Sequence, residues 1–352
     1  MTELYDYKVL SEKHPEILDN LLTGNGFSIE FDSKFRYGGL YEYLQTKGLF
    51  KVREQNLFKA FETTNFEQVL NSLLKAHTIN KTFGKDTDYL DESYQTIKDL
   101  LIMAVKEIHP EYWLLDINKL AWSFNVFKKN IFTTNYDLLS YWALLALRNK
   151  KLIRDGFWPR DDRKLSFQSD TLYNNHFKLY YLHGALHLYE DRGDVIKITS
   201  TGANLMDDIT KEYEKGNFPV YVSEGASEKK LAQIKSNNYL SYCYHELLNS
   251  DGGITIIGQG LNPEYDKHLI DAIKNSKVKF IAYGVFDTPD TTKDYIVETT
   301  KKHFGDLEDK ELLFYDSKNF FESIKEMAYD QKSVLWGKLP WHFSKNIKLL
   351  LC

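Results

Sequence analysis

Residues 131–137 read IFTTNYD, an apolar run that breaks abruptly into an amide and a carboxylate. A second run, YYLHG at residues 180–184, breaks into an imidazole and a glycine. Buried strands of an open α/β sheet end in this way at a functional rim, because ligands bind in the crevice beyond the carboxyl ends of the strands. The two stretches therefore predict neighbouring strand ends that deliver Asn135, Asp137 and His183 to one cleft.

Two glycine turns fit the same plan. Residues 21–23 (LLT) run into the turn GNGFS at residues 24–28, and residues 254–257 (ITII) run into GQGL at residues 258–261. Glycine reaches positive φ at little cost and leaves room for close approach of a phosphate. One such turn is weak support for a binding site, but four strand ends of this kind in one chain favour a common ligand cleft.

Composition narrows the class of protein. The 352 residues suffice for one large domain or two small ones, and a hydrophobic share of 43% supports a sizeable core. A net charge of −5 argues against binding nucleic acid through its phosphates. No run of about 18 apolar residues predicts a membrane span, and the acidic start of the chain is unlike a signal peptide. We therefore expect a cytoplasmic protein.

The order of patterns along the chain predicts an α/β fold. From residue 130 onward strands alternate with helices, which is typical of a parallel sheet with helices on both faces. Strands are expected at 130–134, 177–182, 195–200, 218–223, 253–258, 278–283 and 311–315. Helices are expected at 136–149, 226–249, 265–275, 290–304 and 317–329.

Three other segments have distinct patterns within what we expect to be one domain, residues 1–352. Residues 38–128 carry helical spacing and predict a helical insertion. Residues 154–176 are typical of a long loop. The tail, residues 333–352, is apolar, and we expect it to pack on the body or on another subunit.

Simpler explanations exist for each polar residue. Asn135 and Asp137, each taken alone, are more often helix caps than site residues, because both amide and carboxylate side chains cap helices well. His183 and His187 are spaced by four, as in helical zinc pairs, but a preceding strand and a glycine between them argue against a metal. Asp266 is expected to cap the helix that follows it rather than to contact a ribose.

The four motifs, in this order, resemble those of the sirtuin-like superfamily, and more closely its bacterial branch of NAD-cleaving enzymes in anti-phage defence. The resemblance implies a Rossmann-like sheet. It rests on residues 24–28, 133–137, 182–184 and 258–261. Sirtuin deacylases carry a four-cysteine zinc module, which a chain with two cysteines cannot form. The Pro-Asp-Phe-Arg segment of deacylases is also missing, with only Phe35-Arg36 faintly similar, and Asn25 stands where alanine is commoner.

The resemblance implies an NAD+ glycohydrolase that cleaves NAD to ADP-ribose and nicotinamide without a metal. Asn135 would orient the ribose hydroxyls and a water, His183 would be the general base, and Asp137 would face the nicotinamide or orient Asn135. The diphosphate would lie on backbone N–H groups of residues 24–28. The expected NAD-binding residues are Gly24, Asn25, Gly26, Phe27, Ser28, Thr134, Gly258, Gln259, Gly260 and Leu261.

By the same resemblance the protein would be a toxic effector of anti-phage or abortive-infection defence. Such an enzyme must be held inactive until it is triggered, so we expect a homo-oligomer, a regulatory partner or a phage trigger to control it. Two other classes stay open: a module that senses NAD or ADP-ribose without cleaving it, and a protein ADP-ribosyltransferase or deacylase. A metal-dependent nuclease is a more distant alternative.

Overall fold

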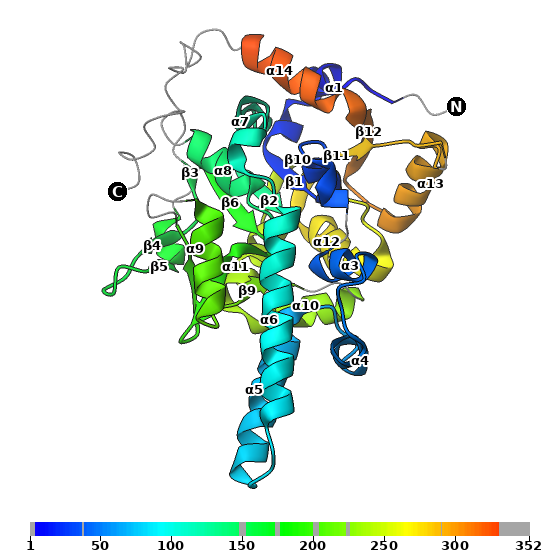
Figure 1. Ribbon diagram of the computed structural model, residues 1–352. Helices are drawn as coiled ribbons and strands as arrows, with labels where there is room; N and C mark the ends of the chain where they lie inside the picture. Colours follow the sequence, from blue (N-terminus) through cyan, green and yellow to red (C-terminus); the bar gives the residue numbers. More distant parts are fainter. Residues whose placement is uncertain are drawn as a thin grey trace.

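The computed structural model describes residues 4–36, 39–147, 153–172, 177–199, 204–222, 226–289 and 291–330. At its centre lies a seven-stranded sheet in the order β12-β11-β10-β1-β2-β6-β3, and each neighbouring pair is parallel (Figure 1). The strands are β1 (Asn20–Thr23), β2 (Asn130–Thr133), β3 (Ile153–Arg154), β6 (Phe177–Tyr181), β10 (Asp251–Ile257), β11 (Lys277–Val285) and β12 (Glu311–Asp316). The predicted α/β class with a Rossmann-like parallel sheet is confirmed.

Helices cover both faces of this sheet in two groups. One group packs together from both ends of the chain and consists of α1 (Tyr7–Lys13), α7 (Ile117–Asn125), α8 (Leu139–Leu147) and α14 (Phe320–Asp330). The other consists of α10 (Ser227–Ser236), α11 (Asn238–Leu248), α12 (Pro263–Asn275) and α13 (Lys293–Phe304). The covered sheet explains why β1 and β6 are buried along their whole length, as near-continuous apolar strands of parallel sheets are.

The described part of the chain between β1 and β2 consists of helices joined by short loops and contains no strand. It holds α2 (Asn25–Ile29), α3 (Leu40–Thr46), α4 (Val52–Ala60), α5 (Phe66–Thr82) and α6 (Asp88–Ile108), followed by α7. The long helices α5 and α6 pack against each other and extend away from the sheet as an arm (Figure 1). The apolar stripe of α6 runs from Leu90 to Ile108, so its last turn reaches back to the body of the protein.

A second sheet was not predicted. It has five strands in the order β4-β5-β8-β7-β9, and all its pairs are antiparallel. These are β4 (Phe157–Pro159), β5 (Leu165–Phe167), β7 (Gly184–Asp191), β8 (Asp194–Lys197) and β9 (Pro219–Tyr221). The predicted strands at 195–200 and 218–223 therefore exist as β8 and β9 but belong to this sheet and not to the parallel one.

The prediction of a long loop at residues 154–176 is also wrong, because β4 and β5 lie within this range. Strands of three residues are too short to show a period of two in the sequence. The β7–β8 hairpin was readable in principle: Arg192 and Gly193 both have positive φ, the conformation of a type I′ turn. Arginine is not typical of the first position of that turn, so the sequence did not indicate a hairpin here.

The predicted helix at 226–249 is broken into α10 and α11. Asn237 between them is extended, and its side chain accepts a hydrogen bond from the Leu240 N–H as the cap of α11. The helices α8, α12, α13 and α14 lie where helices were expected. The apolar tail at 333–352 lies outside the described residues.

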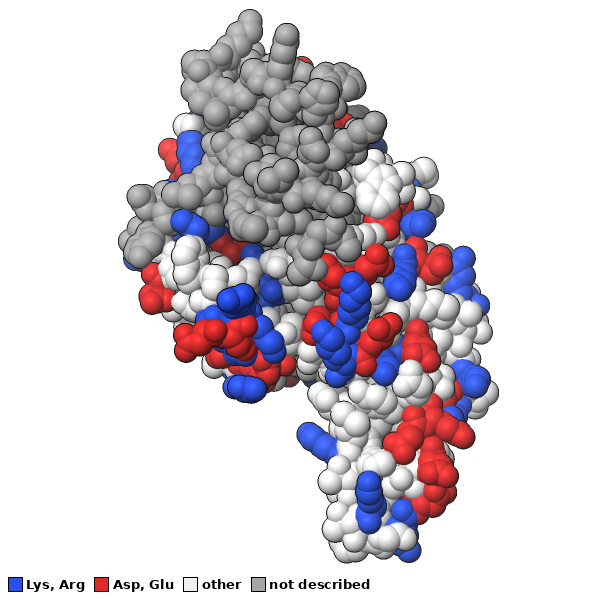
Figure 2. All heavy atoms as spheres, turned by 60° about the vertical axis from the view of Figure 1, so that its left-hand side comes forward, with Lys and Arg blue, Asp and Glu red and all other residues white. Residues whose placement is uncertain are grey.

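On the face shown in Figure 2, acidic and basic side chains are interspersed rather than gathered by sign. None of the helices in the described part of the chain combines the length and the apolar character that a membrane crossing requires.

Candidate functional site

Four neighbouring strands end at the site. β10, β1, β2 and β6 are consecutive in the sheet, so their carboxyl ends bring the four sequence motifs together. The chain leaves β1 for β2 on one side and later returns to β10 on the other side. This reversal is a topological switch point, where open α/β sheets bind their ligands.

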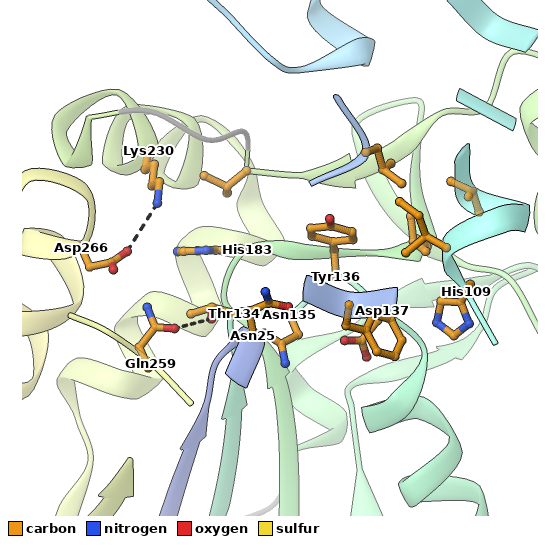
Figure 3. Close-up of a pocket in the computed structure, with 16 residues that line it drawn as sticks. Asn25, His109, Thr134, Asn135, Tyr136, Asp137, His183, Lys230, Gln259 and Asp266 are labelled. Atoms are coloured by element: carbon orange, nitrogen blue, oxygen red, sulfur yellow. Dashed lines mark hydrogen bonds and ion pairs between the residues drawn. The ribbon is translucent and has the colours of Figure 1, made fainter. Parts of the chain in front are cut away.

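A cavity of about 250 Å³ lies beyond these strand ends. Six of the expected site residues line it: Asn25, Thr134, Asn135, Asp137, His183 and Gln259. The others, which are Gly24, Gly26, Phe27, Ser28, Gly258, Gly260 and Leu261, are not among its lining residues. The side chains form a row, with Lys230, Asp266 and His183 at one end, Asp137 and His109 at the other, and Asn135 and Tyr136 between them (Figure 3).

Asn135 is fixed by the first glycine turn. Its amide Nδ2 donates to the carbonyl of Gly24 at 2.9 Å and to Oγ of Ser28 at 2.7 Å. The hydroxyl of Ser28 in turn donates to Oδ2 of Asp137 at 2.5 Å. Since Nδ2 is fully engaged, the carbonyl Oδ1 of Asn135, which has no partner among the described residues, is the atom left for a ligand.

Asp137 is a buried carboxyl group with an altered acidity. Burial raises its pKa to about 6, while hydrogen bonds from the Ser28 hydroxyl and the Leu139 N–H partly oppose this rise. Oδ1 accepts the Leu139 N–H at 2.8 Å, near the start of α8, so the residue does cap a helix. It also holds Ser28 and, through it, Asn135. The cap and the site role are therefore combined in one side chain.

His183 touches the cavity and a second imidazole. Its Nε2 lies 3.0 Å from Nε2 of His268, and Nδ1 of His268 lies 2.8 Å from Oγ of Ser227. Burial lowers the pKa of His183 well below its ordinary value, and His268 and Lys230 lower it further. Both burial and Lys230 lower the pKa of His268, to about 4. Both rings are therefore neutral, and His268 is a residue that the sequence analysis missed.

An ion pair stands beside His183. Nζ of Lys230, on α10, lies 3.4 Å from Oδ1 of Asp266, on α12, and both side chains are largely buried (Figure 3). Burial raises the pKa of Asp266, and Lys230 opposes the rise. The prediction that Asp266 caps the following helix is wrong, because Asn262 caps α12. Asp266 lies at a kink inside α12 and lines the cavity.

The glycine turns pack against each other. Gly24 N–H donates to Ile257, Gly26 N–H donates to Gly258, and Phe27 N–H donates back to Gly24. A Cβ on Gly26 would lie 2.7 Å from the Cα of Gly258, which itself has a φ of +68°.

These contacts correct one expectation about the first turn. Three of the N–H groups in residues 24–28 that were expected to bind a diphosphate are already engaged within the protein. The glycines are required here for close contact between two strand ends rather than for a ligand alone. Leu261, with a φ of +47°, completes the second turn as a buried residue.

The helical chain between β1 and β2 supplies most of the apolar wall of the cavity. Phe35, Leu40, Val105 and Ile108 line it, and none of them was predicted as a site residue. His109 lines it too, but both of its ring nitrogens are engaged: Nε2 accepts the Leu138 N–H, and Nδ1 faces the carbonyl of Pro110. His109 is therefore held as a structural residue, whereas Nδ1 of His183 has no hydrogen-bond partner among the described residues.

The two histidines considered as a metal pair, His183 and His187, lie just before a strand and on it. His183 precedes β7 and His187 lies within that strand, so the two do not share a helix face. Among the described residues there is no group of three His, Cys, Asp or Glu side chains arranged to hold a metal ion. His187 is fully buried between the rings of Tyr141 and Tyr181, and neither of its ring nitrogens has a hydrogen-bond partner in the described structure.

Comparison with known proteins gives a family without a known activity. No curated protein matches the chain. Residues 21–321 match the model of a family described as a domain of unknown function, DUF4917, and this range contains all four strand ends of the site. The chain belongs to the DUF4917 family.

Proposed function

We propose that this protein is an NAD+ glycohydrolase that cleaves NAD to ADP-ribose and nicotinamide. The observation that supports this most is the convergence of Asn135, His183 and the Ser28–Asp137 pair on one cavity at the switch point of the sheet. An amide, an imidazole and a carboxyl group in a partly apolar cavity are suited to hold a ribose and to transfer a proton.

Cleavage of an N-glycosidic bond passes through an oxocarbenium-like ribosyl centre, as in other glycoside chemistry. Nicotinamide leaves as a neutral molecule from a cationic ring, so the leaving group needs no acid. The protein must instead hold the ribose and activate water. Oδ1 of Asn135 would accept a hydrogen bond from a ribose hydroxyl or from the attacking water, because its Nδ2 is bound to Gly24 and Ser28.

His183 would take up the proton that the water or the ribose hydroxyl loses. Its ring is neutral and lines the cavity, which is the state that a proton acceptor requires. His109, the other imidazole in the lining, has both nitrogens engaged. The structure thus favours His183 over His109 for this role.

The size and charge of the cavity suggest how NAD would lie. About 250 Å³ is below the range of roughly 300–1,000 Å³ typical of pockets that enclose a whole drug-sized ligand. The cavity would enclose the nicotinamide and its ribose, with the apolar wall at Val105 and Ile108 against the ring. Lys230 is the one lysine or arginine among the described lining residues and would take over the diphosphate contact from the engaged glycine N–H groups.

We further propose that hydrolysis of NAD serves as a toxic response to phage, controlled by a homo-oligomer, a partner or a trigger. The insertion is suited to regulate such an enzyme. The last turn of α6 lines the cavity at Val105 and Ile108, whereas its first turns lie in the arm far from the sheet (Figure 1). A partner bound to the arm would therefore act on the wall of the cavity through one rigid helix.

The test is nicotinamide release from NAD by the purified full chain. We expect turnover by the wild type and at least 100-fold less by His183→Ala and by Asn135→Ala, in line with the loss of a general base. Surface variants His245→Ala and Asn275→Ala serve as matched controls and should retain full turnover.

Other outcomes identify other functions. Tight binding of NAD without turnover, with or without phage-derived extract, would identify a sensing module. Transfer of ADP-ribose to protein would identify a transferase. Absence of both binding and turnover would contradict the proposal.

A further inference from the structure

His183 does not stand alone in the site. His268, on α12, contacts it through Nε2, is not among the residues that line the cavity, and is itself almost fully buried. Ser227, the first residue of α10, holds His268 at two points: its Oγ accepts the backbone N–H of His268 at 2.8 Å and lies 2.8 Å from Nδ1 of the same residue. Two helices thus fix the second imidazole against the first.

The direction of these hydrogen bonds decides what His183 offers to a ligand. A serine oxygen has two acceptor positions, so Oγ of Ser227 can accept both N–H groups of His268. In that arrangement Nε2 of His268 is an acceptor, and His183 donates to it from its own Nε2. Because a neutral imidazole carries a single N–H, Nδ1 of His183 is left with a lone pair.

We propose that His268, held by Ser227, is a positioning residue that fixes His183 as the Nε2–H tautomer and makes Nδ1 the basic nitrogen of the cavity. The tautomer does not depend on the reaction, but its catalytic meaning rests on the proposed function. In the hydrolysis, water forms the new C–O bond to the ribose carbon as the C–N bond breaks and its electron pair leaves with nicotinamide. The proton lost by water moves to Nδ1 of His183.

The same contact also serves the protonated ring. Once Nδ1 is protonated, Nε2 of His183 still donates to Nε2 of His268, with 3.0 Å between the two nitrogens. His268 therefore offers the imidazolium of His183 a hydrogen-bond acceptor.

The reverse set of hydrogen bonds defines the alternative. If the hydroxyl of Ser227 donates to Nδ1 of His268, then His268 donates from Nε2 and His183 carries its proton on Nδ1. His183 would then present a donor to the cavity and could not accept a proton there.

The first test measures the tautomer directly by NMR of the full chain labelled with ¹⁵N-histidine. The His183 signals are assigned by their loss in His183→Gln. We expect Nε2 of His183 to show the chemical shift of a protonated ring nitrogen and Nδ1 that of an unprotonated one. The opposite pair of shifts overturns the proposal, whether or not the protein cleaves NAD. In Ser227→Ala the two tautomers of His183 should become mixed.

The second test compares two replacements of His268 in NAD turnover. In His268→Gln the amide oxygen still accepts the Nε2–H of His183, whereas His268→Leu has no acceptor. We expect kcat to fall roughly 10–100-fold in His268→Leu with KM nearly unchanged, and the glutamine variant to recover most of the loss. His245→Leu, on the exposed face of α11, is the control.

The outcomes are separable. An unchanged kcat in His268→Leu, or a change confined to KM, contradicts the role of His268. Failure of the wild type to cleave NAD contradicts the proposed function, and the NMR measurement then still decides the tautomer. If circular dichroism shows that His268→Leu does not fold, the turnover of His268→Gln and the NMR spectra decide whether His268 positions His183.

Discussion

Replacement of Asp137 by Asn should change the stability of the protein in opposite directions at low and neutral pH. Asp137 is 5% exposed, and burial raises its pKa to about 6. The unfolded chain titrates an aspartate near 3.9. The folded protein therefore binds this proton more tightly than the unfolded chain, and ionisation of Asp137 opposes folding.

The magnitude follows from the two pKa values. Their separation corresponds to ~3 kcal/mol of stability, present below about pH 4 and lost as the pH rises to about 6. The variant Asp137→Asn has no such loss. It has one acceptor oxygen in place of two, so the bond from Ser28 or that from Leu139 disappears, at a cost of about 1 kcal/mol.

The assay is urea unfolding of wild type and Asp137→Asn at pH 3.5 and pH 7.5. The variant should be less stable than the wild type by ~1 kcal/mol at pH 3.5 and more stable by ~2 kcal/mol at pH 7.5. Asp99→Asn, on the exposed face of α6, is the control for a lost surface carboxylate. A difference between wild type and Asp137→Asn that is the same at both pH values would refute the reasoning, since it would mean that Asp137 titrates alike in both states.

Three further predictions concern neighbouring features. Gly26→Ala should lower the free energy of unfolding by ~1–3 kcal/mol and weaken NAD binding, because its Cβ would press on the backbone of Gly258. In the control Gly260→Ala the new Cβ would have no atom within 4 Å, so calorimetry should show unchanged stability and unchanged NAD binding. His187→Phe should raise the thermal midpoint, because it removes two buried nitrogens that have no partner in the described structure; a lowered midpoint would show that the site is polar and hydrated. Lys230→Gln should raise the KM for NAD at least 10-fold, and the effect should shrink as salt rises; an unchanged KM would place the diphosphate elsewhere.

The strand ends were predictable because each is marked within a few residues. A buried parallel strand is a short apolar run, and its end at the site is a sudden change to polar residues and glycine. Residues 131–137 carry that change in full, and the structure places Asn135 and Asp137 at the carboxyl end of β2 as the pattern indicates. Local patterns of this kind need no knowledge of tertiary packing.

The partners from the helices were not predictable in the same way. Lys230 and His268 lie within α10 and α12, one or more turns from any motif, and only the packing of these helices against each other brings them to His183. For Asp266 a local rule was available and misled, because Asn262 is an equally good cap and starts the helix earlier.

The sequence correctly indicated that the first glycine turn follows β1, but the expected reason for its glycines, binding of a diphosphate, is only partly right. Gly24 and Gly26 mark the end of β1, as the sequence indicates, but the structure shows that their N–H groups and their missing side chains serve the contact with residues 257–259. A sequence shows that a position requires glycine and does not show whether a ligand or another strand end occupies the space.

We propose that NAD binds with its nicotinamide ribose between Asn135 and His183. The most direct measurement is a crystal structure of Asn135→Ala, in which cleavage is blocked, grown with NAD. We expect intact NAD with its nicotinamide ribose in the cavity, within hydrogen-bond distance of Nδ1 of His183, and its diphosphate near Lys230. NAD bound at another place, or a cavity that stays empty at millimolar NAD, would contradict it.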